Sequence, residues 1–141
     1  VVSFTGCYNM NYMFKDCVSL SRAPQCSLGN YVTGMFNGCT SLAFVPLMDA
    51  SSVKEMAGMF NICTNLEDIR GFTGLGRNLS SNGVNIFLGC KKISRSSVIN
   101  IFENLESVSN KYISFEQEVL NRLSDEDITI ATDKGWYVQS Y

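Results

Sequence analysis

Six cysteines carry the most obvious chemical potential in this chain, because a thiolate can bind a metal, act as a nucleophile or form a disulfide. They are Cys7, Cys17, Cys26, Cys39, Cys63 and Cys90. No two of them form a Cys-x-x-Cys pair, and the chain has no histidine. Zinc sites draw on closely spaced Cys and His, and thioredoxin-like centres need the Cys-x-x-Cys pair. The sequence therefore predicts no metal site, no redox centre and no cofactor.

Serine and acidic residues offer other routes to catalysis, but their arrangement does not support one. A serine nucleophile needs a positioned base, and neither a Gly-x-Ser-x-Gly nor a His-Glu-x-x-His motif is present. Acidic residues are adjacent at 67–68 and 125–127. Neighbouring residues point to different faces of an element, whereas glycoside hydrolysis requires two carboxylates that face one bond. We therefore predict that the protein is not an enzyme.

Four of the cysteines belong to a repeated frame, [Met/Ile]-Phe-x-x-Cys-x-x-[Leu/Ile], at 13–20, 35–42, 59–66 and 86–93. Successive frame cysteines are 22, 24 and 27 residues apart, inside the range of roughly 20–29 residues that leucine-rich repeats occupy. A unit of this size cannot bury its apolar face alone, so Phe, Cys and Leu are each expected to stack on their equivalents. The frame cysteines are then buried free thiols, and the pairing of Cys7 and Cys26 stays open.

The half of each unit that precedes the cysteine has a helical periodicity. In the third unit the apolar residues at intervals of three and four are Val53, Met56, Phe60 and Cys63. This spacing places them on one face and predicts a short helix. Ser52 and Glu55 have the spacing of a capping box at its start.

The half that follows the cysteine reads as a short extended run, at 20–25, 42–47 and 66–71. Pro24 and Pro46 occupy the same register, where the backbone N–H must be dispensable, as at the margin of a strand. The predicted fold is therefore an α/β, leucine-rich-repeat-like right-handed solenoid of about four to five short helix–strand units.

The C-terminal part of the chain departs from the regular unit. We expect a solenoid over 1–112, with an irregular, glycine-rich fourth unit at 71–93 and a shortened fifth unit at 98–112, in which Leu105 replaces the cysteine. No Lys-Ser/Thr pair follows the glycines in P-loop register, so the expanded loop is not expected to bind phosphate.

Residues 113–141 are predicted to close the stack as a C-terminal capping unit. Ser124 and the acidic residues after it indicate a helix start, because carboxylates are favourable near the positive end of the helix dipole. Gly135 is the expected C-cap of this helix, and a final short strand is expected at 136–139.

The segment Ser-Ser-Val-x-x-Met-x-x-Met-Phe-x-x-Cys-Thr-x-Leu at 51–66 resembles the repeats of BspA-like leucine-rich-repeat proteins of bacterial surfaces. The ending at 123–136 is similar to the C-terminal cap of such proteins from gut commensals. The resemblance covers nearly the whole chain and implies the C-terminal portion of a secreted or cell-surface protein, such as a bacterial lipoprotein. The implied role is adhesion or host-protein binding. The long fourth insertion and the shortened fifth unit depart from an evenly curved ligand face.

Stacked extended runs would place equivalent side chains in rows. Two positions beyond the frame Leu or Ile stand Arg22, Phe44, Asp68 and Arg95. A row that combines arginine, an aromatic ring and a carboxylate has the chemistry of a protein contact surface, so these are the predicted ligand-binding residues. Phe44 is the candidate anchor if it is exposed; if the register shifts by one residue, it belongs to the core.

Charge and hydropathy limit the range of partners. The net charge is −2 and only 17% of residues are charged, so no basic field favours nucleic acid or an anionic membrane. No apolar run reaches the roughly 18 residues of a membrane span, so membrane contact would require an anchor upstream of Val1. The expected partner is a protein, from the host or its matrix, with a glycan as the alternative ligand. A structural spacer or capping segment of a larger surface protein is the alternative function.

Overall fold

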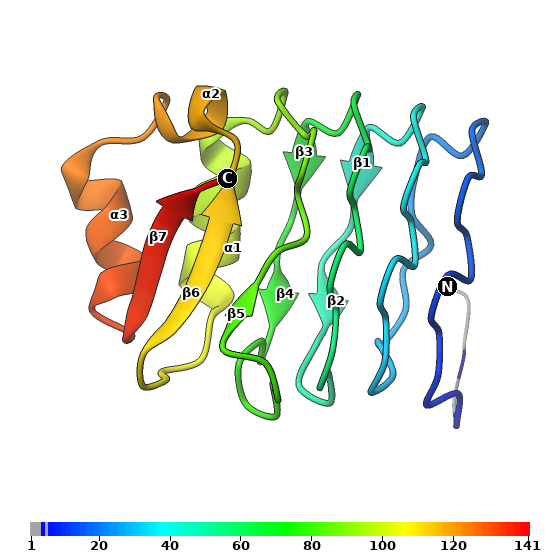
Figure 1. The fold of residues 1–141 in the computed structure, drawn as a ribbon, viewed down its shortest axis with the longest axis horizontal. Helices are drawn as coiled ribbons and strands as arrows, with labels where there is room; N and C mark the ends of the chain where they lie inside the picture. The colour runs from blue at the N-terminus through cyan, green and yellow to red at the C-terminus, as the bar shows by residue number, and fades with distance from the viewer. Residues whose placement is uncertain (1–3, 5) are drawn as a thin grey trace.

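The computed structural model describes residue 4 and residues 6–141. Short units of chain lie side by side from the N-terminal end to a C-terminal cap that contains the helices (Figure 1). The strands are β1 Phe44–Val45, β2 Met48–Asp49, β3 Asp68–Ile69, β4 Phe72–Thr73, β5 Gly83–Val84, β6 Lys111–Phe115 and β7 Trp136–Ser140. The helices are α1 Arg95–Asn104, α2 Gln117–Leu120 and α3 Asp125–Thr132.

Neighbouring units pair in parallel, with residues one repeat apart opposite each other. In the pair β1–β3, Phe44 lies opposite Asp68, and β2 pairs with β4 in the same way. Isolated bridges continue this register into the preceding unit, where Arg22 lies opposite Phe44 and Ser27 opposite Asp49. The offsets of 22 and 24 residues equal those between the first three frame cysteines. The predicted stacking of equivalent residues is therefore confirmed for these units.

The segment before each frame cysteine is a series of tight turns, so the predicted helix over 53–63 and its capping box at Ser52 are wrong. Every second backbone N–H closes a turn, as where Cys63 N–H donates to Phe60 O at 3.0 Å. The N–H groups between them donate to the next unit, as where Phe60 N–H donates to Ile86 O at 3.0 Å. Each of these turns is closed by an N–H that donates to the carbonyl three residues earlier. A series of such turns gives apolar side chains the same spacing of three and four residues as a helix.

These turns require left-handed backbone at regular places. Gly34 and Gly58 have φ of +57° and +64°, and Ile62 has φ of +63°. Glycine is favoured there because it has no Cβ to clash, whereas a β-branched residue such as Ile62 is uncommon. Gly34 has a second reason to be glycine, since a Cβ at this position would lie 2.5 Å from Cε1 of Tyr12 in the preceding unit.

A ladder of phenylalanine rings runs through the core along the stack. The ladder consists of Phe14, Phe36, Phe60, Phe87 and Phe115. Successive ring centroids lie 5.2, 5.4, 5.9 and 5.3 Å apart, and the ring planes are within 13° of parallel. These distances are those of favourable stacked aromatic pairs. All the rings except the first are fully buried, so the ladder forms the centre of the core.

A ladder of thiols runs beside the rings. The Sγ–H groups of Cys39, Cys63 and Cys90 donate to the backbone oxygens of Phe14, Phe36 and Phe60 at 3.0, 3.1 and 3.0 Å. All six cysteines are free, and these three are fully buried as predicted. The prediction is wrong for Cys17, which is exposed. Cys17 belongs to the first frame, and no earlier frame covers it among the described residues.

The predicted shortened fifth unit at 98–112 is wrong, because the chain after Ile93 forms α1. Phe102 lies inside this helix and meets Phe115 edge-on at 6.0 Å, and Phe115 of β6 supplies the fifth ring of the ladder. Side chains of α1 take over the hydrogen bonds that a further strand would make with β3. Ile69 N–H donates to Ser97 Oγ at 2.8 Å, and Asn100 Nδ2 donates to Ile69 O at 3.0 Å.

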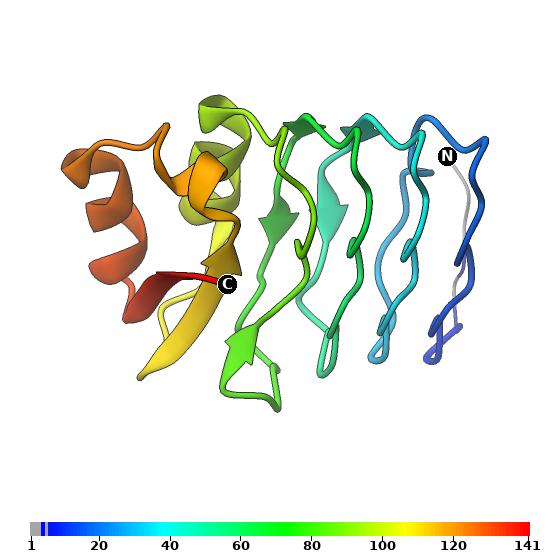
Figure 2. The same ribbon diagram turned by 45° about the horizontal axis from the view of Figure 1, so that its top comes forward.

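A three-stranded parallel sheet, in the order β5-β6-β7, closes the stack, with α3 beside it (Figures 1 and 2). The predicted final strand is present as β7, and the predicted boundary between 112 and 113 falls inside β6. The predicted helix start is also confirmed, because Ser124 and Asp127 form a capping box at the beginning of α3. Gly135 is not the C-cap of α3; Asp133 is, and Gly135 follows two residues later with φ of +87°.

An ion pair joins α1 to α3. Arg95 Nε and Nη2 donate to the two carboxylate oxygens of Asp127 at 2.7 and 2.8 Å. The Asp127 side chain is nearly buried and also accepts from Ser124 N–H at 2.9 Å. Hydrogen bonds from Arg95, and then from Ser124, lower the pKa of Asp127 to about 2.

The contact between Tyr12 and Gly34 predicts the effect of a substitution. Gly34→Ala combines left-handed strain, which costs about 1–2 kcal/mol for a residue with a Cβ, with a clash against the Tyr12 ring. Gly89→Ala is the matched control, because Gly89 is also left-handed but a Cβ there would make only ordinary contacts. Urea unfolding should give a larger loss for Gly34→Ala than for Gly89→Ala. Equal losses would contradict the proposed contact.

The ion pair predicts a pH-dependent stability. The folded pKa of Asp127 lies below the value of about 4 for an unfolded aspartate. Its contribution is therefore full above pH 4 and is lost as the pH falls toward 2. Asp127→Asn should lower the free energy of unfolding at pH 7, and the difference from wild type should shrink between pH 4 and 2. Asp125→Asn, on the same first turn, serves as the control. A difference that stays constant with pH would refute the assignment.

Candidate functional site

Three of the four side chains predicted to form a row lie on adjacent units. The pairing places Arg22 opposite Phe44 and Phe44 opposite Asp68. Each is followed by a buried residue, and these residues are Ala23, Val45 and Ile69. Because side chains alternate between faces in extended backbone, the row points away from the core. The register therefore positions these three side chains on one outer face.

Phe44 is half-buried, and its ring is covered by cations rather than by the core. The guanidinium carbon of Arg22 lies 4.0 Å from the centroid of the ring. The guanidinium carbon of Arg70, from the unit on the other side, lies 5.4 Å from the same centroid. Both distances are in the range of cation–π attraction. Phe44 thus serves as a platform for two arginines, and the alternative, a register shift that places Phe44 in the core, does not occur.

Asp68 is already paired with Arg70, a residue that was not among the predicted ligand-binding residues. Nε and Nη2 of Arg70 each lie 3.2 Å from a carboxylate oxygen of Asp68. Arg70 occupies the register of Pro24 and Pro46. Because the equivalent residue in the two preceding units is proline, the repeat does not predict a charged side chain at this position. The pair is largely exposed, so it organises the surface more than it stabilises the fold.

Arg95 does not join the row, which corrects its predicted role. Ser94 caps α1 by accepting from Ser97 N–H at 3.2 Å, so the chain becomes helical at the position where the row would continue. Arg95 is the first residue of this helix and binds Asp127. Its guanidinium therefore braces the cap and is not available at the row.

A groove with a volume of about 690 Å³ lies beside the row. It is lined by Ala43, Glu67, Asp68, Arg70, Ser94, Ser96 and Asn100. The small side chain of Ala43 leaves space next to Phe44, and the N-terminal part of α1 contributes Ser96 and Asn100. The exposed carboxylate of Glu67 has no hydrogen-bond partner among the described residues. The groove offers hydrogen bonds and one unpaired negative charge.

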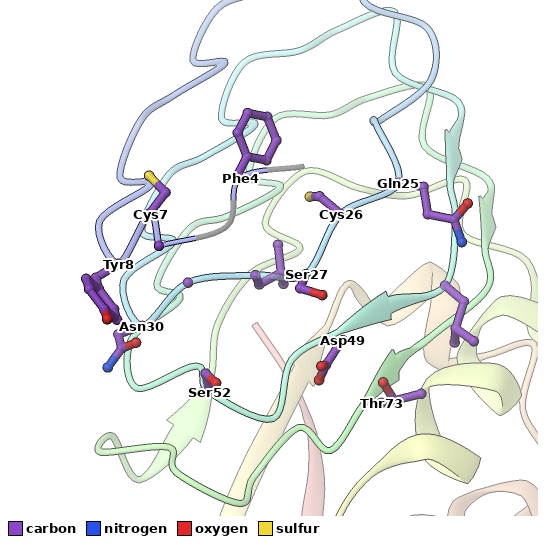
Figure 3. A pocket seen from close by; sticks show the side chains of 14 residues that line it. Phe4, Cys7, Tyr8, Gln25, Cys26, Ser27, Asn30, Asp49, Ser52 and Thr73 are labelled. Atoms are coloured by element: carbon purple, nitrogen blue, oxygen red, sulfur yellow. The ribbon is translucent and has the colours of Figure 1, made fainter. Parts of the chain in front are cut away.

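A second cavity, with a volume of about 670 Å³, lies toward the N-terminal end (Figure 3). Asp49 and Thr73 of β2 and β4 lie next to each other in it, and the ring of Tyr8 stands at its edge, 71% exposed. The hydroxyl and N–H of Ser51 donate to Asp49 at 2.7 and 2.9 Å, which lowers the pKa of this carboxyl. The repeated frame gives no signal for this cavity, because Tyr8 lies outside the frame.

Cys7 and Cys26 line the second cavity, and both are free thiols. Cys7 Sγ–H donates to Asn9 O at 3.4 Å, whereas Cys26 is buried. Burial raises the pKa of the Cys26 thiol, so it stays protonated at neutral pH and is a poor nucleophile. The sequence left open whether Cys7 and Cys26 pair, and in this structure they are two separate thiols.

Within residues 4 and 6–141, no three Cys, Asp or Glu side chains are grouped as metal ligands. No helix in this part of the chain is both long and apolar enough to span a bilayer. Comparisons with family models, curated proteins and solved structures found no match to the chain.

The thiol ladder predicts two classes of cysteine reactivity. Burial raises the pKa of Cys90 to about 12 and also raises that of Cys63. With an aromatic disulfide reagent at pH 8, the exposed Cys17 and the half-exposed Cys7 should react quickly in the folded protein, and the other four slowly. All six should react quickly in urea. Cys17→Ser should remove one fast thiol and no slow one. A ladder thiol that reacts as fast as Cys17 would contradict the structure.

Proposed function

We propose that this chain is a non-enzymatic binding module that contacts a protein ligand through the row and its flanking arginine. We call this surface, formed by Arg22, Phe44, Asp68 and Arg70, the arginine–phenylalanine face. The observation that supports the proposal is the stacking of two guanidinium groups on one aromatic ring beside a groove. Arginine and aromatic residues are enriched where proteins bind each other.

The backbone beneath this face favours recognition by side chains. Ala43 N–H donates to Ser21 O at 2.9 Å, and Arg70 N–H donates to Val45 O at 3.0 Å. Because these groups are already paired between units, a ligand cannot bind here by adding a strand. The same hydrogen bonds hold the side chains on a rigid support, which reduces the entropy lost on binding.

We further propose that the stacked units are part of a leucine-rich-repeat-like solenoid of a secreted or cell-surface protein. Parallel pairing at the repeat offset supports the solenoid. The resemblance of 51–66 to BspA-like repeats supports the surface location and an adhesive role. In this setting the C-terminal sheet and α3 would cover the last unit, which would otherwise present unpaired backbone to water.

Carbohydrate binding at the second cavity is the second candidate function. An exposed aromatic ring, Tyr8, stands there beside hydrogen-bonding side chains that include Asp49 and Asn30. Such a combination can cover the apolar face of a sugar and pair its hydroxyl groups. The remaining alternative is that the chain acts only as a spacer or cap, with no ligand of its own.

A peptide selection tests the proposed function. A random peptide library displayed on phage would be selected on the immobilised protein and counter-selected on the variant Arg22→Ala/Phe44→Ala/Asp68→Ala. Selected peptides should bind the variant at least about tenfold more weakly, equivalent to about 1.4 kcal/mol. The double variant Tyr8→Ala/Asp49→Asn, at the second cavity, should bind them like wild type. Urea unfolding of each variant shows whether the fold is retained.

The other outcomes separate the alternatives. Peptides that bind the triple variant as well as wild type would contradict a role for the arginine–phenylalanine face. Capture on a glycan array that the Tyr8/Asp49 variant loses would favour carbohydrate binding. A protein that captures neither peptides nor glycans would favour the spacer.

A further inference from the structure

We propose that Arg22 is a carboxylate-binding residue, which receives an acidic side chain of the protein ligand on the arginine–phenylalanine face. This inference rests on the proposed function and names the chemistry that the face recognises. It depends on three features of Arg22: its N–H groups have no partner among the described residues, its guanidinium contacts the Phe44 ring, and no acidic side chain of the row offsets its charge.

Arg22 differs from the other arginines because its N–H groups have no partner among residues 4 and 6–141. Arg70, Arg77 and Arg95 bind Asp68, Glu106 and Asp127, and Arg122 donates to Ile93 O at 3.0 Å. Arg22 is exposed and makes no hydrogen bond or ion pair with residues 4 and 6–141. A guanidinium has five N–H donors and stays charged, so Arg22 presents an unused binding group to the surface.

Contact with Phe44 restricts the position of this unused group. The guanidinium carbon is 4.0 Å from the ring centroid, so the ring covers one side of the cation. The donors of a guanidinium lie in its plane and radiate from its edge, so contact with a ring leaves them accessible. Such a planar fork matches the two oxygens of a carboxylate. Because the ring restricts the side chain before binding, less conformational entropy is lost when a ligand arrives.

No acidic side chain of the row neutralises Arg22. Asp68 belongs to the same row, but Phe44 lies between the two residues and Arg70 already holds the carboxylate. The positive charge of Arg70 is therefore offset by Asp68, whereas that of Arg22 is not. The arginine–phenylalanine face thus has an uncompensated positive charge at one end.

The charges farther along the face favour a single carboxylate over a polyanion. Glu67 contributes an unpaired carboxylate to the groove two units away, at a distance of about 10 Å for two strand spacings. A phosphate dianion or a sulfated polysaccharide would be repelled by this group. An extended peptide covers that distance in about three residues. We therefore expect the ligand to carry an acidic residue at Arg22 and a basic or neutral polar residue about three positions away, over Glu67.

Two matched libraries of short synthetic peptides test the inference. Both are acetylated and amidated at their ends, and they differ only in that one contains Asp and Glu where the other contains Asn and Gln. The wild-type chain should capture the acidic library at least about tenfold better. Arg22→Gln should remove this preference, and Arg22→Lys should retain only part of it, because lysine keeps the charge without the planar fork. Arg77→Gln, which alters a paired arginine elsewhere, should leave it unchanged.

The possible failures are distinguishable. Equal capture of both libraries, with capture lost in Phe44→Ala, would reject carboxylate binding and keep the proposed binding face. An acidic preference that survives in Arg22→Gln would assign the carboxylate to another residue. A third library with phosphoserine at the Asp and Glu positions completes the test, and better capture of this library than of the acidic one would overturn the choice of ligand. Capture of neither library would overturn the proposed function and this inference with it. Equal urea midpoints for wild type and Arg22→Gln exclude unfolding as the cause.

Discussion

Parallel stacking in register is the constraint on which this structure depends. Equivalent backbone atoms recur about every 4.8 Å, so each side chain must accommodate its own equivalent on either side. Phenylalanine meets this condition by stacking ring on ring, and cysteine by donating its Sγ–H to a phenylalanine carbonyl of the preceding unit. Glycine meets it at position 34 by leaving space for the ring of Tyr12. The residues of the repeated Phe-x-x-Cys frame are thus ones that can pack against the neighbouring units of the same repeat.

The register could be predicted from sequence because it depends on which residues recur and at what interval. The local backbone could not, since a series of turns that donates alternate N–H groups to the next unit has the apolar spacing of a helix. The fifth ring of the ladder, Phe115, could not be predicted for a related reason. A motif match does not show that the chain after Ile93 forms the ten-residue helix α1. Because of this helix, the ring that stacks on Phe87 comes from Phe115, farther along the chain.

The candidate site also has one part that could be predicted from the register and one part that could not. Arg22, Phe44 and Asp68 follow from the register, so their juxtaposition was accessible from the sequence. The contacts among them were not, because cation–π stacking and the capture of Asp68 by Arg70 depend on rotamers and on a residue in a proline position. Arg95 was lost from the row because Ser94 starts a helix, and Tyr8 was overlooked because it has no counterpart in the frame.

Unpaired cysteines usually indicate a reducing compartment, because exposed thiols are oxidised elsewhere. The sulfurs of Cys39, Cys63 and Cys90 are enclosed between units and protonated, so an oxidant or a second thiol reaches them only when neighbouring units separate. Free cysteines at these positions are therefore compatible with an oxidising environment. They also make the protein its own probe of local opening: under conditions where reclosing outpaces modification, the rate at which each sulfur is labelled measures how often its two flanking units part.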